Sequence, residues 1–330
     1  MSTKMRALVL ESYNSDFTNS QIDKPSPKAG EVLVKIIASG VNPIDNKIRT
    51  ENAPYATPVL PAVLGTDLAG IVEEVGENVA NFNVGDEVYG LAGGVLGLQG
   101  TLAEYTAVDA DLLAIKPKNL TMREAAAVPL NILTAWEGLV DRFTIKKGDK
   151  VLVHGGTGGV GHMAVQLAKI LGAEVFSTVS PSKIAAVETL GATGIDYTTA
   201  EVNNYVAEFT NGKGFDVIYD TVGGATLDNS FKAVRHYGHI SSCAAFETHN
   251  LATGSLRSAN LHSVFVLYPM LSGEGRKHHG EILKQVTQYI EDGKLKPIVD
   301  PRKFTLDNAL EAHVAVNDGS ANTKIVVEII

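Results

Sequence analysis

Three glycines in a fixed spacing constrain the fold of this chain more than any other feature. Gly156, Gly158 and Gly161 form a G-x-G-x-x-G pattern. They follow residues 150–155, which have the composition of a strand, and lead into 160–171, where apolar residues recur at helical spacing. Such a turn brings unpaired backbone N–H groups and the positive end of a helix dipole to one point, where they bind a pyrophosphate. The pattern predicts a dinucleotide-binding βαβ unit.

Strand and helix patterns continue to alternate after this loop. Further strands are expected at 174–179, 215–220, 238–243 and 262–268, and a helix is expected at 182–190. This alternation predicts an α/β fold with a doubly wound parallel sheet of the Rossmann type.

The two ends of the chain have a different pattern. Residues 1–120 contain short β-branched runs separated by Gly, Pro, Asn and Asp, which predicts a small antiparallel barrel or sandwich. Thr121 precedes Glu124 by three residues, so a capping box is expected there. The tail is expected to form two helices and a last strand, at 279–291, 306–316 and 323–329.

Composition narrows the class of protein. The 330 residues carry a net charge of −9 and no basic block, which argues against a nucleic-acid partner. The single Cys243 excludes an intramolecular disulfide and a Cys-rich zinc site, and it is expected to be a small packing residue. No stretch reaches the roughly 20 apolar residues of a membrane span, and the apolar run 7–10 is too short for a signal peptide. A cytoplasmic protein is expected.

The end of the second strand of the expected Rossmann sheet indicates which dinucleotide binds. NAD sites place a carboxylate there, whereas Glu174 stands at the other end of this strand. Ser177 and Ser180 can donate hydrogen bonds to a 2′-phosphate, and Lys183 supplies positive charge. We therefore expect NADPH rather than NADH.

Several long stretches together carry a family resemblance that covers nearly the whole chain. They are residues 38–49, 60–76, 82–90, 125–139, 151–173 and 215–224. With these the chain resembles the medium-chain dehydrogenases/reductases, in their zinc-free quinone oxidoreductase (zeta-crystallin-like) branch. The resemblance implies a GroES-like β-rich catalytic domain and, inserted into it, a Rossmann domain with the nicotinamide in a cleft between the two. The expected bounds are 1–122 plus 273–330 and 123–272. It also implies a homodimer formed through the Rossmann sheet edge, with 262–268 as the pairing strand.

The sequence departs from the zinc-dependent relatives at their ligand positions. Those relatives place a Cys where this chain has Asn42, and a Gly-His-Glu where it has Gly65-Thr66-Asp67. Asp45 and Asp67 alone cannot supply the three ligands that a catalytic zinc needs, so no metal is expected. The pair His278-His279 is expected on the solvated surface.

The resemblance also implies which residues contact the cofactor. Thr134 would lie beside the nicotinamide, and Tyr197 near the adenosine phosphate. The pyrophosphate would lie on Gly156, Gly158, Gly159 and Val160. Ser242, Phe265 and Val266 would flank the nicotinamide end, and Asn322 and Lys324 of the returning C-terminal segment would close over the cofactor.

Hydride transfer without a metal favours an activated acceptor. A quinone spreads the arriving charge onto oxygen and needs positioning and a few hydrogen-bond donors. The resemblance suggests Asn42, Tyr55 and Lys47 for this task, with the Asn42 amide orienting the acceptor carbonyl or a cofactor ribose, and Tyr55 donating a hydrogen bond or stacking on a flat substrate. No single general acid stands out.

Two other functions remain open on the sequence. One is NADPH-dependent reduction of α,β-unsaturated carbonyls or enoyl thioesters; the thioesters rank lower because the segment 42–61 offers only Lys47 and Arg49 to a coenzyme A tail. The other is a non-enzymatic cofactor-binding structural or RNA-binding protein, and the acidic charge balance argues against RNA.

Overall fold

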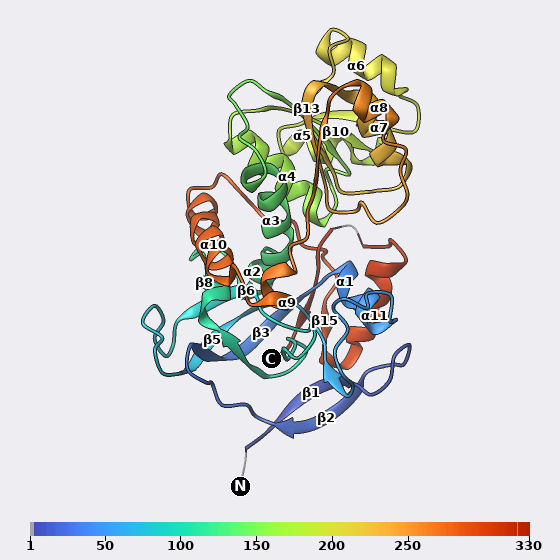
Figure 1. Cartoon of the computed structure of the whole chain (residues 1–330). Coiled ribbons are helices and arrows are strands. Elements are labelled where there is room, and N and C mark those ends of the chain that lie inside the picture. Colours follow the sequence, from blue (N-terminus) through green and yellow to red (C-terminus); the bar gives the residue numbers. More distant parts are fainter. Residues whose placement is uncertain (1–2, 322) are drawn as a thin grey trace. The chain divides into compact units, whose positions relative to one another are not determined.

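The computed structural model describes residues 3–321 and 323–330, and the chain divides into two compact units. The split unit contains Met1–Leu130 and Leu267–Ile330, and the inserted unit contains Asn131–Val266. Figure 1 follows the chain from blue to red, and the split unit contains both of these colours. The domain expected at 123–272 is slightly longer at both ends than the inserted unit.

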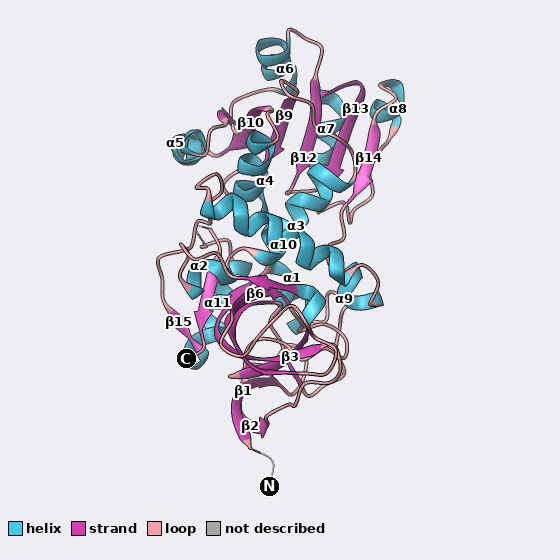
Figure 2. Ribbon diagram, turned by 90° about the vertical axis from the view of Figure 1, so that its left-hand side faces the viewer, coloured by secondary structure: helices cyan, strands magenta, loops and turns pink. Residues whose placement is uncertain are grey.

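A six-stranded parallel sheet forms the centre of the inserted unit. Its strand order is β11-β10-β9-β12-β13-β14, so the chain starts in the middle, runs outward and then crosses to the other half (Figure 2). The carboxyl ends of the two central strands form the switch point at which such sheets bind ligands. The strands are β9 (Lys150–His154), β10 (Glu174–Val179), β11 (Thr193–Asp196), β12 (Phe215–Asp220), β13 (Val234–Ser242) and β14 (Asn260–Ser263).

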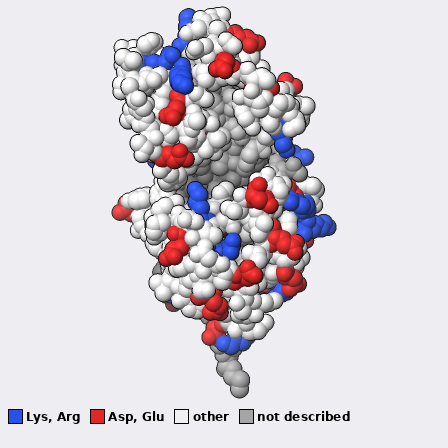
Figure 3. Space-filling view, turned by 90° about the vertical axis from the view of Figure 1, so that its right-hand side faces the viewer, with Lys and Arg blue, Asp and Glu red and all other residues white. Residues whose placement is uncertain are grey.

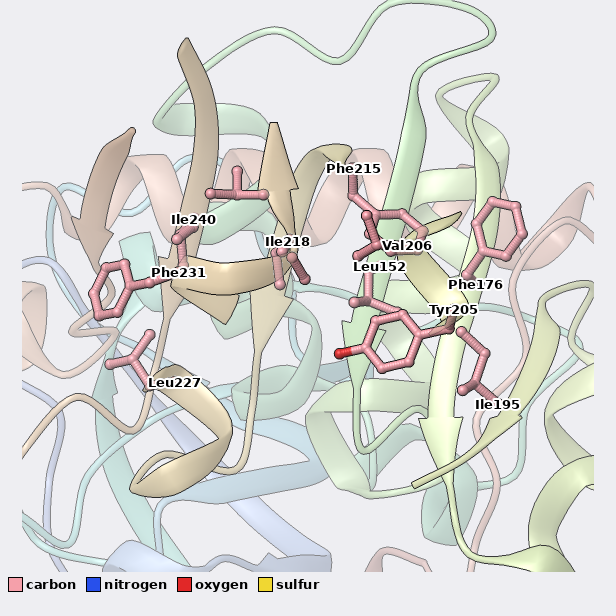
Figure 4. Close-up of a cluster of buried hydrophobic side chains, with 12 residues drawn as sticks. Leu152, Phe176, Ile195, Tyr205, Val206, Phe215, Ile218, Leu227, Phe231 and Ile240 are labelled. Carbon is pink, nitrogen blue, oxygen red and sulfur yellow. The ribbon is translucent and has the colours of Figure 1, made fainter. Parts of the chain in front are cut away.

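Helices connect these strands and bury their apolar faces. Leu152, Ile218 and Ile240 stand side by side on three neighbouring strands and form the centre of the core (Figure 4). Phe231 packs on them from one helix and Tyr205 from another. The helices are α3 (Pro129–Trp136), α4 (Gly159–Ile170), α5 (Ile184–Thr189), α6 (Val202–Thr210), α7 (Ala225–Ala233) and α8 (Ala252–Leu256). The expected α/β fold with a parallel Rossmann sheet is confirmed.

The prediction of a last strand at 262–268 is wrong over most of that segment. Only His262 and Ser263 of the segment 262–268 belong to β14, and helix α9 (Tyr268–Ser272) begins at its end. Val264 and Val266 are buried at 5% and 8% exposure and belong to no strand, although the Val264 N–H donates to the Ser242 carbonyl at the end of β13. A short apolar run indicates burial, and burial alone does not distinguish a strand from a packed connection.

The split unit is built around a mainly antiparallel, curved seven-stranded sheet. Its order is β15-β16-β3-β5-β6-β8, and β7 pairs with β3. These strands are β3 (Glu31–Val41), β5 (Asp67–Val75), β6 (Glu87–Leu91), β7 (Tyr105–Asp109), β8 (Leu113–Ile115), β15 (Phe304–Thr305) and β16 (Ile325–Glu328). A three-stranded sheet contains β1 (Lys4–Leu10), β2 (Thr18–Asp23) and β4 (Ala62–Val63). Strand β16, near residue 330, thus pairs with β3, which lies within the first 41 residues.

The helices of the split unit include both that were expected in the tail. They are α1 (Pro43–Arg49), α2 (Met122–Ala126), α9, α10 (Arg276–Glu291) and α11 (Ala309–Asn317). The capping box of Thr121 and Glu124 at the start of α2 is confirmed. His278 is exposed as expected, but His279 is 6% exposed, and this burial lowers its pKa to about 4. Helix α10 packs on β8, which turns one histidine of the adjacent pair inward.

Two surface properties bear on partners. Among the described residues, no helix is both long and apolar enough to cross a membrane. On the face drawn in Figure 3, acidic and basic side chains are interspersed rather than gathered by sign.

Candidate functional site

The glycine loop leaves the start of α4 open. Strand β9 ends at His154, Gly155 adopts a φ of +75°, and α4 starts at Gly159. Gly158 is the N-cap residue, and no side chain caps the helix. The first N–H groups of a helix have no intrahelical acceptor, so this end offers donors and a positive dipole to an anion.

The three glycines of the pattern have different packing environments. A Cβ atom on Gly161 would lie 2.0 Å from the carbonyl oxygen of Gly155, and one on Gly156 would lie 2.1 Å from Ser177 Oγ. A Cβ on Gly158 meets nothing closer than the Gly155 oxygen at 3.3 Å. Gly156 and Gly161 therefore allow loop, strand and helix to pack closely, and Gly158 leaves the loop surface clear. This bare backbone cradle fits a dinucleotide pyrophosphate.

Ser177 has a different role from the one expected. Its side chain is fully buried, donates to the Val153 carbonyl at 2.7 Å and accepts from the Gly156 N–H at 3.0 Å. A hydroxyl engaged in this way holds the loop in shape and does not face a 2′-phosphate. The expectation for Ser177 is therefore corrected, because the close approach at Gly156 places this hydroxyl inside the fold.

Three other expected residues lie at the carboxyl ends of the neighbouring strands β10 and β11. Ser180 and Lys183 are half-buried, at the beginning and end of the turn that follows β10. Tyr197 follows β11, is 61% exposed, and donates its backbone N–H to Val179 at 3.3 Å. Glu174 stands at the opposite end of β10, where it pairs with Lys150. The structure thus groups one lysine with two hydroxyl side chains, and the end of β10 carries no carboxylate. The Asp196 carboxylate at the end of β11 accepts the hydroxyls of Thr198 and Thr199.

A row of buried polar side chains crosses the same edge of the sheet. Thr178, His154, Asp220 and Ser242 occupy matching positions on the adjacent strands β10, β9, β12 and β13. Thr178 Oγ1 lies 2.8 Å from His154 Nδ1, and the Ser242 hydroxyl donates to Asp220 Oδ2 at 2.7 Å. Burial lowers the pKa of His154 to about 4, so its ring is neutral near pH 7. Asp220 also accepts the backbone N–H groups of Val222 and Gly223, which shapes the loop after β12.

Of the residues in this row, only Ser242 was expected at the site from the sequence. The others could have been recognised because each buried strand ends on a polar residue. In a parallel sheet, such ends meet at one edge.

The remaining residues expected near the nicotinamide also lie in the inserted unit. Thr134 is 4% exposed, and its carbonyl accepts the hydroxyl of Tyr219 at 2.7 Å. The Phe265 N–H donates to the Glu137 carboxylate at 3.2 Å, and Val266 is buried beside it. These contacts fix the backbone at both positions.

A second polar group lies in the split unit and is buried throughout. We call it the Lys324 cluster; its members are Asn42, Asp45, Thr66, Asp67 and Lys324. None is more than 3% exposed. The Asn42 amide donates to Thr66 Oγ1 at 2.9 Å and to Asp67 Oδ2 at 2.8 Å. The Lys324 ammonium donates to Asp67 Oδ2 at 2.7 Å and to Asn42 Oδ1. Asp45 Oδ2 accepts the Asn42 backbone N–H at 2.7 Å.

Sheet register brings this cluster together. Gly40 of β3 lies opposite Asp67 of β5, and Val41 lies opposite Ile325 of β16. Lys324 therefore arrives beside Asn42 from the far end of the chain. Gly40 leaves room for it, because a Cβ atom there would lie 2.8 Å from the Lys324 side chain.

Two expectations are corrected by this cluster. Both amide hydrogens of Asn42 already have acceptors and its oxygen has a donor, so the amide is not free to orient an acceptor carbonyl. Lys324 is 3% exposed and paired with Asp67, so it does not close over a cofactor from outside. Asn322, which was expected to act with it, lies outside the described residues.

The residues at the zinc-ligand positions do not fit that metal. Among the described residues, no three His, Cys, Asp or Glu side chains gather in a way that could hold a metal ion. Asn42 and Thr66 hydrogen bond to each other, and the oxygen of Asn42 already binds a cation, the Lys324 ammonium. A second cation at this point would be repelled.

The two other expected acceptor residues are accessible. Lys47 is exposed on α1, and Tyr55 is 39% exposed in the segment after it. Partial burial raises the pKa of Tyr55 above its ordinary value, so its hydroxyl stays protonated and can donate.

Comparison with known proteins identifies the family. Residues 28–118 match the alcohol dehydrogenase GroES-like domain, and residues 159–269 match the zinc-binding dehydrogenase domain. The NADPH-dependent alkenal/one oxidoreductase of Arabidopsis thaliana is 35% identical over 93% of this chain and 74% of that protein. The quinone oxidoreductase of Sus scrofa is 29% identical over 89% of this chain and 87% of that protein.

A solved structure extends the match to the whole fold. An alcohol dehydrogenase superfamily protein from Novosphingobium aromaticivorans is 48% identical, with a TM-score of 0.97 over 99% of this chain and 100% of that one. The chain therefore belongs to the medium-chain dehydrogenase/reductase superfamily, in its zinc-free quinone oxidoreductase branch, a family of oxidoreductases.

Proposed function

We propose that this protein is an NADPH-dependent reductase that transfers hydride to a conjugated carbonyl acceptor, either a quinone or an α,β-unsaturated ketone or aldehyde. The observation that carries the proposal is the uncapped, glycine-lined start of α4, which offers backbone donors to a pyrophosphate. The names of the two relatives cover both acceptor classes.

The choice of NADPH rests on the ends of β10 and β11. Lys183 supplies a positive charge, and the Ser180 and Tyr197 hydroxyls can hydrogen bond a phosphate. A ribose-binding carboxylate is missing from the end of β10, which disfavours NADH. The name of the Arabidopsis relative gives NADPH as the cofactor of that protein.

The residues then have separate tasks. Bound NADPH supplies the hydride. The α4 N-terminus and the glycine loop hold the pyrophosphate, and Thr134, Ser242, Phe265 and Val266 border the nicotinamide end. Lys47 and Tyr55 carry accessible donors for the carbonyl oxygen of the acceptor, where negative charge develops. In this assignment the split unit is the catalytic domain and the inserted unit is the cofactor domain.

We also propose a homodimer that forms through the edge of the inserted sheet. Strand β14 is the last in the sheet order, and Leu256 and Leu261 beside it are 83% and 39% exposed. A second copy would satisfy this open edge and cover the leucines. Light scattering would show twice the mass of one chain, and Leu256→Lys should shift it toward the monomer. We keep the cytoplasm as the proposed compartment.

An acceptor panel tests the enzymatic function. The purified protein is mixed with NADPH and quinones, enones, enoyl thioesters or saturated aldehydes, and NADPH loss is followed by absorbance. Turnover is expected with quinones and enones and not with saturated aldehydes. Tight NADPH binding without turnover of any acceptor would instead support a structural, non-enzymatic role.

A further inference from the structure

Asp45 is the one carboxyl group of the Lys324 cluster without a charge partner in direct hydrogen-bond contact. It lies in the first turn of α1 and is 1% exposed. Its Oδ2 accepts the Asn42 N–H, while its Oδ1 is buried with no hydrogen-bond partner among the described residues. A buried carboxylate oxygen without a donor is costly, whereas a protonated carboxyl group is neutral and can itself donate.

The charges around Asp45 do not compensate a negative charge on its carboxyl group. Lys324 is paired with Asp67, whose other oxygen accepts the Leu130 N–H at 2.8 Å. These two charges cancel, so an ionised Asp45 would add an uncompensated negative charge. From α11, the His313 ring remains neutral, because burial lowers its pKa to about 3.

The protonation of Asp45 is therefore balanced near neutral pH. Burial raises its pKa to about 7. The Asn42 N–H, the Lys324 charge and the Thr66 side chain oppose that shift, and the Asp67 charge adds to it. Both protonation states are then accessible at working pH, which is the requirement for a group that gives up and regains a proton in each turnover.

We propose that Asp45 is the proton source that completes the reduction, and that Lys324 stabilises the carboxylate left behind. This inference rests on the proposed function. When hydride and its electron pair form a new C–H bond in an enone, the acceptor becomes an enolate, and when they form a new O–H bond in a quinone, it becomes a hydroquinone anion. The O–H bond of Asp45 then breaks, and its proton neutralises that anion. Asp45 recovers a proton from solvent before the next turnover.

Thr66 provides a route for this proton. Its Oγ1 accepts a hydrogen bond from Asn42 Nδ2, and its side chain also interacts with the Asp45 carboxyl group, where it lowers the pKa of Asp45. A hydroxyl can receive one proton and release another without becoming charged overall. Asp45 therefore acts through its neighbours, and Lys324 is a positioning residue for the reaction.

The experiment compares Asp45→Asn with wild type. The amide keeps the shape and the acceptor for the Asn42 N–H and removes the acid. We expect kcat with an enone to fall about 100-fold, within the range for general acids. Wild-type kcat should fall as pH rises through about 7, because the acid form disappears, and Asp45→Asn should show no such fall. The NADPH dissociation constant should not change.

Two further variants keep the result interpretable. Glu124→Gln alters the equivalent capping box at the start of α2, outside the cluster, and should retain wild-type kcat and pH profile. Thr66→Val keeps the acid but removes the route, and should lose activity as Asp45→Asn does. Thermal melting of each variant verifies that it is folded.

The outcomes separate the two proposals. If wild type oxidises NADPH in the presence of none of the tested acceptors, the proposed function is wrong, and the role of Asp45 is wrong with it. If wild type turns over and Asp45→Asn matches its kcat and pH profile, only the proton role is overturned.

Discussion

The glycine loop and the Lys324 cluster form polar surroundings in opposite ways. The loop offers backbone N–H groups at an open helix end and uses glycines to keep side chains away. The cluster contains two carboxyl groups, an ammonium, an amide and a hydroxyl, all nearly without exposure. Substitutions in the loop should therefore act through sterics and remain local, whereas substitutions in the cluster should act through uncompensated charge.

The largest effect is expected from Lys324→Met. It leaves Asp67 buried without its cation, and such losses cost about 3–5 kcal/mol of stability. Denaturant unfolding measures the change, and the double variant Lys324→Met with Asp67→Asn should recover most of it. A single variant as stable as wild type would show that the pairing of Lys324 with Asp67 adds no net stability.

Gly161→Ala is expected to have the next largest effect. The added methyl group would meet the Gly155 carbonyl, and overpacking of this kind costs about 1–3 kcal/mol. The loop must shift, so NADPH affinity measured by fluorescence titration should fall. Gly158→Ala is the matched variant, because its added methyl group has more space within the protein. The NADPH affinity of this variant reports how closely the cofactor approaches the loop backbone. Wild-type affinity in Gly161→Ala would contradict the steric account.

Lys183→Ala tests the charge at the end of β10. Losing one charged contact to a 2′-phosphate should lower the ratio of NADPH to NADH affinity about tenfold, or about 1.4 kcal/mol. Lys213→Ala, at an exposed lysine elsewhere on the inserted unit, is the control. An unchanged ratio would remove Lys183 from the phosphate site.

The smallest effect is expected from Ser177→Ala. It deletes the hydrogen bonds to Val153 and Gly156, which should cost about 1 kcal/mol of stability by thermal melting. Affinity for NADPH and NADH should change by the same factor, since the hydroxyl supports the loop. A selective loss of NADPH affinity would restore the phosphate role that the structure argues against.

How well the sequence predicts each region depends on how far apart along the chain its residues lie. The loop is contiguous, and strands such as β12 at 215–220 follow from local pattern alone. Lys324 and Asn42 are 282 positions apart, and only the pairing of β16 with β3 shows that they meet. Ser177 was assigned to the wrong task because the sequence does not show which side of a buried strand faces the loop.

The surroundings of Asp45 could not be predicted either, although Asp45 lies only three positions after Asn42. Its position beside Asn42 is visible in the sequence, but its missing partner depends on Thr66, Asp67 and Lys324, which come from two other segments. Burial and charge balance are properties of assembled surroundings, so the sequence alone offered no general acid.

The pairing of β16 with β3 also has a consequence for synthesis. During translation the inserted unit is complete once Val266 has emerged, whereas the split unit waits for its final strand. Until then Asp67 lacks its cation, and the edge of β3 that receives β16 stays open. The nascent chain therefore carries an unfinished sheet until β16 has emerged and paired with β3.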